Sequence, residues 1–457
     1  MPLPVLENRL GEHANTGTSP AVICAGQELS YPQLLDKTAD YAAQLSAAGV
    51  GAADPVLLSC GFGVDAIACF LALLRLDAIA VLAAPDDPRV EQKLAASQAK
   101  LHLEFPLAGE ALISGQEVRA TDAANLPLVR ELSASGHPGF VIFSSGSTGE
   151  PKAVLHDAQR FTAHLEKVQK AKSTIGFLAF DHIAGVDTLL YTLFAGGTLV
   201  VPEDRSPKAV CQAVEAYKAQ VLPVSPSFLK LLLVSPALEA HDLSSLEVIT
   251  FGSEPPDPAV TEKLAKLLPN ADLLQKYGTS EFGAPRSKTK PGDSRWIKLT
   301  SDDFAVRVVD GVMWVKASGT MLGYLNATDP AEQDGWFCTG DRVEQDGDWL
   351  RILGRDSDLI NVGGEKVFPA EVETVVESLP GVLECAVTGE SHPLLGTVVV
   401  ATVRLTDELL AEELSDAALK QRVRKHCRGQ LPRYAIPVKV LTTTEALTSS
   451  RGKRLRN

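Results

Sequence analysis

Apolar runs of four to six residues alternate with amphipathic stretches through the first two thirds of this chain. A run of this length, bounded by turn-forming residues, has the size of a buried strand. Strands separated by helices predict βαβ units, in which parallel sheets are covered by helices on both faces. The runs that we interpret as strands are Pro55–Cys60, Ile175–Phe180, Thr198–Val201, Val221–Val224 and Val248–Gly252.

The stretch Tyr31–Ala48 is a well-defined predicted helix. Leu34 and Tyr41 fall on one face at helical spacing. Ser30 is a good N-cap, because its side-chain oxygen can accept from a free backbone N–H in the first turn. Gly49 follows the last apolar residue and provides a helix stop.

After about residue 300 the pattern changes from βαβ units to hairpins. An Asp-Gly pair between two apolar, alternating runs is a strong hairpin signal, because both turn residues tolerate positive φ. We expect these hairpins to close the large domain. Their strands are Phe304–Val309 with Val312–Lys316, around Asp310-Gly311, and Arg342–Gln345 with Trp349–Leu353, around Asp346-Gly347.

From Arg355 onward the sequence predicts a compact α+β module. The chain therefore divides into a large α/β N-terminal domain, residues 1–354, made of parallel-sheet βαβ layers and a closing hairpin region, and a small C-terminal domain, residues 355–457. The predicted elements of the small domain are helices at Ala370–Ser378 and Ala417–Gly429 and strands at Val382–Gly389, Val398–Val403 and Val438–Leu441.

The densest chemistry lies in Phe143–Lys152, where hydroxyls, two glycines and one lysine follow a short apolar run. Glycine lets backbone N–H groups approach an anion closely, and hydroxyls and the lysine add further donors. A flexible Ser/Gly loop is the alternative interpretation. The common P-loop is excluded by spacing, because Pro151 precedes the lysine and Ala153 follows it. The segment is a phosphate loop of another kind, or none.

Four further segments, taken with this loop, resemble the signature blocks of the adenylate-forming (ANL) superfamily. This superfamily comprises acyl-CoA and aryl-CoA synthetases, peptide-synthetase adenylation domains and firefly luciferase. The five blocks occur in the family order across almost the whole chain, which makes the resemblance highly specific. The four segments are Tyr277–Glu281, Gly335–Asp341, Gly354-Arg355 continuing through Gly363–Glu373, and Gly452-Lys453.

The resemblance implies a role for each block in binding ATP. The loop grips the β- and γ-phosphates, Ser280 donates to the α-phosphate, and Thr148 and Glu281 hold Mg²⁺, a cation that prefers oxygen ligands. Asp341 accepts from the ribose hydroxyls and Arg355 is a ribose or phosphate partner. Tyr277 and Gly278 line the adenine. The remaining implied nucleotide-binding residues are Ser145, Gly146, Ser147, Gly149 and Lys152 in the loop and Gly252, Ser253 and Glu254 beside the adenine.

The resemblance also implies a two-step reaction with a mobile small domain. Lys453 is the expected catalytic lysine, although its local sequence is also typical of a basic tail. Ser357 occupies the hinge position, where relatives mostly have Asp or Lys. Gly363 and Gly364 would line the tunnel through which a thiol reaches the site.

The acid-binding segment is expected at Phe180–Gly185, delivered by a strand. His182 would orient the substrate carboxylate, or it is an ordinary core histidine. The aspartate that pairs with an amino-acid ammonium in relatives falls near Ile183, which is not an acid, although Asp181 is close enough that a one-residue slip would restore an amino-acid substrate. We therefore favour a carboxylic acid without an α-amino group.

Three functions remain open on these residues. The first is an AMP-forming ligase that joins a carboxylic acid to coenzyme A, and the second is an enzyme that loads the phosphopantetheine of a separate acyl carrier protein. Basic residues of the predicted helix Ala417–Gly429 are candidates to meet either acceptor, and a solvated helix face is the alternative. The third is a non-catalytic nucleotide-binding module. Retention of Lys152, Glu281 and Asp341 argues against it.

Composition limits the possible binding partners and cellular compartment of the protein. The net charge of −14 makes a nucleic-acid-binding surface unfavourable. The seven cysteines are scattered, without metal-ligand or redox spacing, as expected in a reducing cytoplasm. No secretory leader pattern is visible at the start. The most apolar region, Ala66–Pro85, is interrupted by Arg75 and Asp77, so we expect a core helix and a buried strand and no membrane span.

Overall fold

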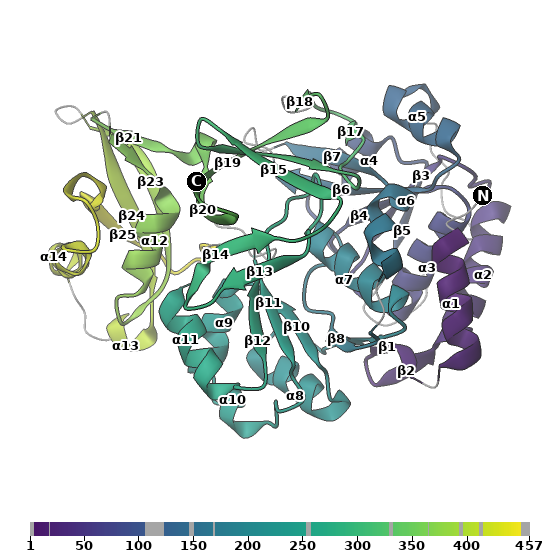
Figure 1. Cartoon of the computed structure of the whole chain (residues 1–457), viewed down its shortest axis with the longest axis horizontal. Coiled ribbons are helices and arrows are strands. Elements are labelled where there is room, and N and C mark those ends of the chain that lie inside the picture. The colour runs from purple at the N-terminus through teal and green to yellow at the C-terminus, as the bar shows by residue number, and fades with distance from the viewer. Residues whose placement is uncertain are drawn as a thin grey trace.

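The computed structural model describes residues 4–17, 19–105, 123–145, 150–167, 170–252, 257–328, 332–363, 365–392, 396–410 and 415–448. It confirms the predicted architecture of a large α/β N-terminal domain with a hairpin region and a small α+β domain. In Figure 1 the small domain, in yellow-green, lies to one side of the large domain. Within the described ranges, no helix combines the length and apolar character needed to cross a bilayer.

The first sheet carries the predicted phosphate loop. Its parallel part contains β5 (Leu101–Glu104), β3 (Pro55–Ser59), β4 (Ile79–Ala83) and β6 (Gly139–Ser145), in that order. The antiparallel strand β7 (Pro151–Asp157) pairs with β6, and β17 (Gly323–Tyr324) pairs with β7. The predicted phosphate loop therefore joins two antiparallel strands of one hairpin.

The second sheet has six parallel strands and one antiparallel edge strand. The order is β12 (Asp272–Gln275), β11 (Val248–Phe251), β10 (Val221–Val224), β8 (Ser173–Ile175), β9 (Thr198–Val201), β1 (Pro20–Cys24) and β2 (Gln27–Ser30).

Helices cover both of these sheets, as the βαβ pattern predicts. One apolar core, which includes Leu34, Phe70 and Phe180, lies among α2 (Tyr31–Ala47), α3 (Val64–Arg75) and α7 (Ile183–Phe194). The helices of the large domain are α1 (Pro4–Thr16), α2 (Tyr31–Ala47), α3 (Val64–Arg75), α4 (Val90–Ser97), α5 (Pro127–Ser135), α6 (Ala158–Thr162), α7 (Ile183–Phe194), α8 (Pro207–Tyr217), α9 (Pro226–Val234), α10 (Ala237–Ala240) and α11 (Pro258–Leu267).

Helix α2 and strand β4 confirm two sequence predictions. Ser30 accepts from the N–H of Gln33, and the Gln33 side chain accepts from the N–H of Ser30, so a full capping box starts α2. The apolar region Ala66–Pro85 contributes α3 and the fully buried strand β4.

The predicted strand Ile175–Phe180 is wrong beyond its first residue. Strand β8 ends at Ile175, although the N–H of Gly176 still donates to the carbonyl of Val200 in β9 at 2.8 Å. The Phe177 ring lies 4.5 Å from the Phe228 ring, and the Phe180 ring stacks on Phe62 at 4.9 Å. These apolar side chains serve packing between elements, which local sequence cannot distinguish from burial in a strand.

The third sheet is antiparallel and contains the predicted hairpins. Asp310 and Gly311 have φ of 51° and 78°, as a two-residue hairpin turn requires. The strand order is β13 (Ser287–Lys290), β14 (Asp293–Leu299), β20 (Trp349–Arg355), β19 (Trp336–Asp346), β16 (Val312–Ala317) and β15 (Phe304–Val309), with β18 (Glu332–Gln333) paired to β19.

The small domain has its own core, formed by apolar residues of its three-stranded sheet and two helices. All five of its predicted elements are present, with shifts of a few residues at their ends. They are α12 (Pro369–Glu377), β23 (Val382–His392), β24 (Gly396–Leu405), α14 (Asp416–Cys427) and β25 (Lys439–Thr442). The hairpin β21 (Ile360–Val362) with β22 (Glu365–Val367) and the short α13 (Asp407–Leu410) complete it.

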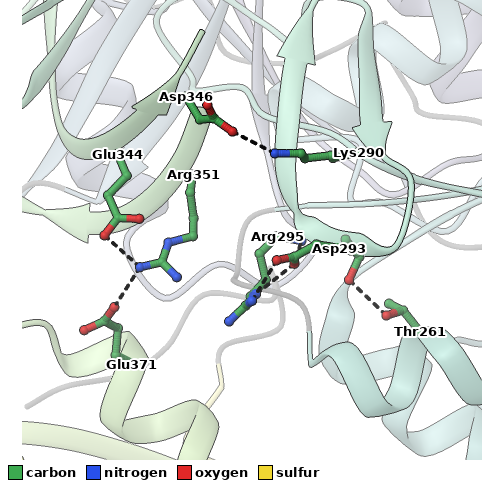
Figure 2. Close-up of polar contacts among 9 residues, drawn as sticks. Thr261, Lys290, Asp293, Arg295, Glu344, Asp346, Arg351 and Glu371 are labelled. Carbon is green, nitrogen blue, oxygen red and sulfur yellow. Dashed lines mark hydrogen bonds and ion pairs between the residues drawn. The ribbon is translucent and has the colours of Figure 1, made fainter. Parts of the chain in front are cut away.

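Two ion pairs join helix α12 to the large domain. Figure 2 shows Arg351 of β20 between two carboxylates, with its Nη2 2.9 Å from Glu344 and 3.6 Å from Glu371 of α12. Lys230 of α9 pairs with Glu377 at the other end of α12. The rotation of the small domain that the family resemblance implies would have to break both pairs.

Candidate active site

The hairpin β6–β7 places Lys152 opposite Ser144 at the base of the predicted phosphate loop. Asn326, just after β17, holds the strand on both sides of this lysine. Its Oδ1 accepts from the N–H of Ala153 at 2.8 Å, and its Nδ2 donates to the carbonyl of Pro151 at 2.9 Å. The backbone that carries Lys152 is therefore fixed. The loop residues Gly146, Ser147, Thr148 and Gly149 lie outside the described residues.

Tyr324 connects the first block to the second. Lys152 Nζ lies 5.1 Å from the centroid of the Tyr324 ring, within the range of a cation–π contact. The hydroxyl of the same tyrosine donates to Glu281 Oε1 at 2.7 Å. The structure thus brings Lys152 and Glu281, predicted from segments far apart in the sequence, to one side chain.

The loop that carries Ser280 and Glu281 is a tight turn. Thr279 and Gly283 exchange backbone hydrogen bonds of 3.1 and 3.0 Å, and Thr279 Oγ1 accepts from the N–H of Glu281. Gly278 is required by close approach, because a Cβ there would lie 2.3 Å from the carbonyl oxygen of Gly283.

The predicted ribose and adenine residues also converge. The Tyr277 hydroxyl donates to Asp341 Oδ2 at 2.5 Å, and Arg355 Nε lies 2.8 Å from Oδ1 of the same carboxylate. Burial and the charge of Asp341 raise the pKa of Tyr277 well above its usual range, so its hydroxyl remains a donor. Burial also raises the pKa of Asp341, although Arg355 acts in the opposite direction.

Gly252, the residue after strand β11, packs against the backbone of Lys276, which precedes Tyr277. The N–H of Lys276 donates to the carbonyl of Phe251, which brings Gly252 against the backbone of Lys276. A Cβ on Gly252 would lie 2.6 Å from the Lys276 carbonyl oxygen, so only glycine fits at this contact. The predicted adenine residues Ser253 and Glu254 lie outside the described residues.

The predicted hinge and tunnel residues lie at the start of the small domain. Ser357 is exposed in a single 3₁₀ turn, Asp356–Asp358, between β20 and β21. Gly363 has a φ of 62° in the β21–β22 turn. Gly364 and Lys453 lie outside the described residues, and of Ser145 the structure describes the backbone pairing with Pro151.

The expected delivery of His182 by a strand is wrong, because β8 ends seven residues earlier. His182 is instead the N-cap of α7, where its Nδ1 accepts from the N–H of Ala184 at 3.2 Å. This contact leaves Nε2 as the ring nitrogen that can carry hydrogen. Orientation of a substrate carboxylate by His182 stays a prediction.

A cluster of buried charged side chains includes Asp181, the residue before His182. Lys93 of α4 is fully buried, with its Nζ 2.6 Å from Asp87 and 4.0 Å from Asp181. The same ammonium lies 4.8 Å from the ring centroid of Phe143, at the end of β6. Lys93 therefore pairs most closely with Asp87, and Asp181 is the second buried carboxylate that its charge faces.

The residues present fit a hard divalent cation beside ATP. Glu281 is buried and receives one hydroxyl donor on Oε1, which leaves carboxylate oxygen lone pairs for a ligand. Its proposed partner, Thr148, would contribute a hydroxyl oxygen, and Mg²⁺ usually retains water alongside few protein ligands. When bound, the cation would neutralise charge on the phosphates.

Sequence reasoning missed three residues of this site: Tyr324, Asn326 and His156. Tyr324 and Asn326 follow a glycine just after the hairpin Phe304–Ala317, and this Gly-Tyr-Leu-Asn segment was the available signal. No local pattern showed that its side chains reach Glu281 and the β7 backbone. His156 lies in β7 itself and contacts the Ser280 carbonyl.

Comparison with known proteins agrees with this geometry. A match to the AMP-binding enzyme family covers residues 11–325, and a match to the AMP-binding enzyme C-terminal domain covers residues 371–453. The chain therefore belongs to the family of AMP-binding enzymes. Its adenylate-forming resemblance and its division into α/β and α+β parts are thereby confirmed.

Sequence identity to individual relatives is below one third. The chain is 29% identical to the indoleacetate–CoA ligase of Aromatoleum aromaticum over 69% of this chain. The aligned part spans less than two thirds of that ligase, 65% of its length.

Two solved structures share the fold over the whole chain. The ATP-bound MatB from Rhodopseudomonas palustris matches with a TM-score of 0.83 at 22% identity and covers 100% of this chain and 97% of its own. The o-succinylbenzoate CoA synthetase of Bacillus subtilis, in complex with an acyl-adenylate intermediate, matches with a TM-score of 0.80 at 21% identity and the same coverage.

The Lys93 cluster generates a stability prediction. We expect Lys93→Met to lower the free energy of unfolding by about 3–5 kcal/mol, because it leaves two buried carboxylates without their cation. Chemical denaturation measures the loss. The matched control is Lys218→Met, which breaks the exposed pair with Asp242 and should change stability far less. Equal losses in both variants would contradict the assigned role of Lys93.

His156 generates a pH prediction. Burial lowers its pKa to about 4, whereas the unfolded chain takes up a proton near its ordinary 6.5. Its contribution to stability is therefore full above pH 6.5 and is lost as the pH falls toward 4, by roughly 3 kcal/mol. His156→Gln should flatten this part of the curve of unfolding free energy against pH. Glu281 and Asp157 are the acidic charges that act on the ring, and parallel curves for the two proteins would refute the assignment.

Proposed function

We propose that this protein activates a carboxylic acid with ATP to an acyl-adenylate, releases pyrophosphate, and transfers the acyl group to a thiol. The observation that supports this most is the position of Tyr324 between Lys152 and Glu281. A cation and a carboxylate that contact one neutral side chain suit a ligand that carries both anionic oxygens and a bound cation. Tyr277, at the start of the loop that carries Glu281, donates a hydrogen bond to Asp341 of β19.

In the first step a carboxylate oxygen of the acid attacks the α-phosphorus of ATP. The new O–P bond forms as the bond to the β-phosphate oxygen breaks, and pyrophosphate leaves with the electron pair. Both reactants are anions, so the protein's contribution is positioning and charge neutralisation. Lys152 and the loop hydroxyls bind the β- and γ-phosphates, Ser280 donates to the α-phosphate, and Lys453 bridges the reacting groups.

In the second step a thiolate attacks the acyl carbon, a C–S bond forms, the bond from that carbon to the phosphate oxygen breaks, and AMP leaves with the electron pair. Rotation of the small domain about Ser357 would bring Gly363 and Gly364 to the site. We assign residues 1–354 to the binding of ATP and acid, and residues 355–457 to the mobile domain with the catalytic lysine.

Coenzyme A is the acceptor we favour, because the indoleacetate relative and the o-succinylbenzoate structure carry that acceptor in their names. The acid lacks an α-amino group in this proposal. Asp181 supports that choice, because its negative charge is already faced by Lys93 inside the protein. An acyl group loaded onto a separate carrier protein remains the second candidate for the same chemistry.

ATP–pyrophosphate exchange with a panel of aliphatic acids, aryl acids and amino acids tests the proposal. We expect acid-dependent exchange and AMP as the nucleotide product. Formation of ADP, or the absence of exchange with every acid, would contradict the proposed function. Adding coenzyme A, and separately a phosphopantetheinylated carrier, to an active mixture then identifies the acceptor.

Lys453 is expected to act only in the first step. Lys453→Ala should reduce exchange by about 100- to 1000-fold, the usual cost of losing one donor to a developing charge. Thiolysis of a supplied acyl-adenylate should remain near the wild-type rate. Lys439→Ala, which removes a lysine paired with Glu390 on the exposed edge of the same domain, is the control. Equal loss in both half-reactions would refute this role.

A further inference from the structure

His156 is a fully buried polar residue in the strand that carries Lys152. It lies four positions after that lysine in β7, directly opposite Phe140 of β6. The two rings stack at 4.8 Å with planes 12° apart, and Phe161 meets the imidazole edge-on at 5.5 Å. A phenylalanine would fill this space, so packing alone does not explain a histidine.

The hydrogen bonds of His156 give a reason for the imidazole. Nε2 lies 2.7 Å from the carbonyl oxygen of Ser280. A carbonyl can only accept, so Nε2 carries the hydrogen and Nδ1 has only its lone pair. Nδ1 is buried, and we find no hydrogen-bond partner for it within the described part of the chain. Burial of the unpaired Nδ1 lowers the free energy of unfolding. A phenylalanine would avoid this cost, but it would lack the N–H donor that Nε2 provides.

The Ser280–Glu281 segment is held on both sides. The carbonyl of Ser280 is bound by His156, and the carbonyl of Glu281 accepts from the N–H of Met321 at 2.7 Å. Phe161 supports the end of the same loop, because a Cβ on Gly283 would lie 2.9 Å from its ring. The imidazole therefore sets the distance between the strand of Lys152 and the loop of Ser280 and Glu281.

We propose that His156 is a positioning residue for adenylation, which fixes Ser280 and Glu281 against Lys152 by its hydrogen bond to the Ser280 carbonyl. The inference rests on the proposed function, because Ser280 and Glu281 are assigned to the α-phosphate and the cation there. His156 is fully buried, so the role we assign to it is to position other residues.

Three variants separate the hydrogen bond from packing. His156→Phe keeps the ring and removes the donor. His156→Gln loses the ring and keeps an amide N–H at a comparable reach. Phe161→Leu disturbs the same aromatic cluster and leaves the hydrogen bond in place. Each is measured for thermal stability, ATP–pyrophosphate exchange, dependence on Mg²⁺ concentration, and thiolysis of a supplied acyl-adenylate.

We expect His156→Phe to fold with a melting temperature close to wild type and to lose about 100-fold in exchange, the effect of a misplacement of about 1 Å at a reacting centre. Its exchange should require a higher Mg²⁺ concentration, because the Glu281 carboxylate is displaced. Thiolysis should change little. His156→Gln should retain more exchange than His156→Phe, even if it is the less stable of the two.

The opposite order would overturn the proposal. If exchange follows thermal stability across the three variants, or if His156→Phe exchanges like wild type, the histidine serves packing alone. If His156→Phe does not fold, His156→Leu gives the same comparison with His156→Gln. Calorimetric binding of ATP with Mg²⁺ is measured as well, and it needs no acid. Weakened binding in His156→Phe supports the role, and unchanged binding counts against it even if wild type exchanges with no acid.

Discussion

The Tyr324 hydroxyl bound to Glu281, beneath the ammonium of Lys152, is the contact on which the arrangement of this site depends. The tyrosine contacts both charges, with its ring toward the cation and its hydroxyl toward the anion. Asp341 is treated in a comparable way, with Tyr277 on one carboxylate oxygen and Arg355 on the other.

Neighbouring residues fix the backbone that carries these charged groups. Asn326 fixes the backbone on both sides of Lys152, and His156 and Met321 fix the two peptide units that carry Ser280 and Glu281. The buried Lys93 joins the end of β6 to the loop of Asp181. In contrast, helix α12 of the small domain meets the large domain through the ion pairs of its Glu371 and Glu377 with Arg351 and Lys230.

Local sequence predicted most of the fold because its signals are local. Ser30 and Gln33 form the capping box that begins α2, and Asp310-Gly311 forms the turn between β15 and β16. The strand Ile175–Phe180 was the main error, since burial against Phe62 and Phe228 gives the same apolar run as burial in a sheet. The misplaced delivery of His182 followed from that error.

The sequence by itself determined the class of protein, the order of the ATP-binding blocks and the residue types in each block. This was possible because the charged, hydroxyl and glycine residues of each block lie within a few positions of one another. Only the tertiary structure decided which of these residues share a contact. Tyr324 reaches Glu281 across 43 residues and His156 reaches Ser280 across 124. These contacts depend on how β7, β17 and the Tyr277–Gly283 loop pack together. The periodicity of the sequence predicts each element separately and does not predict which elements pack against each other.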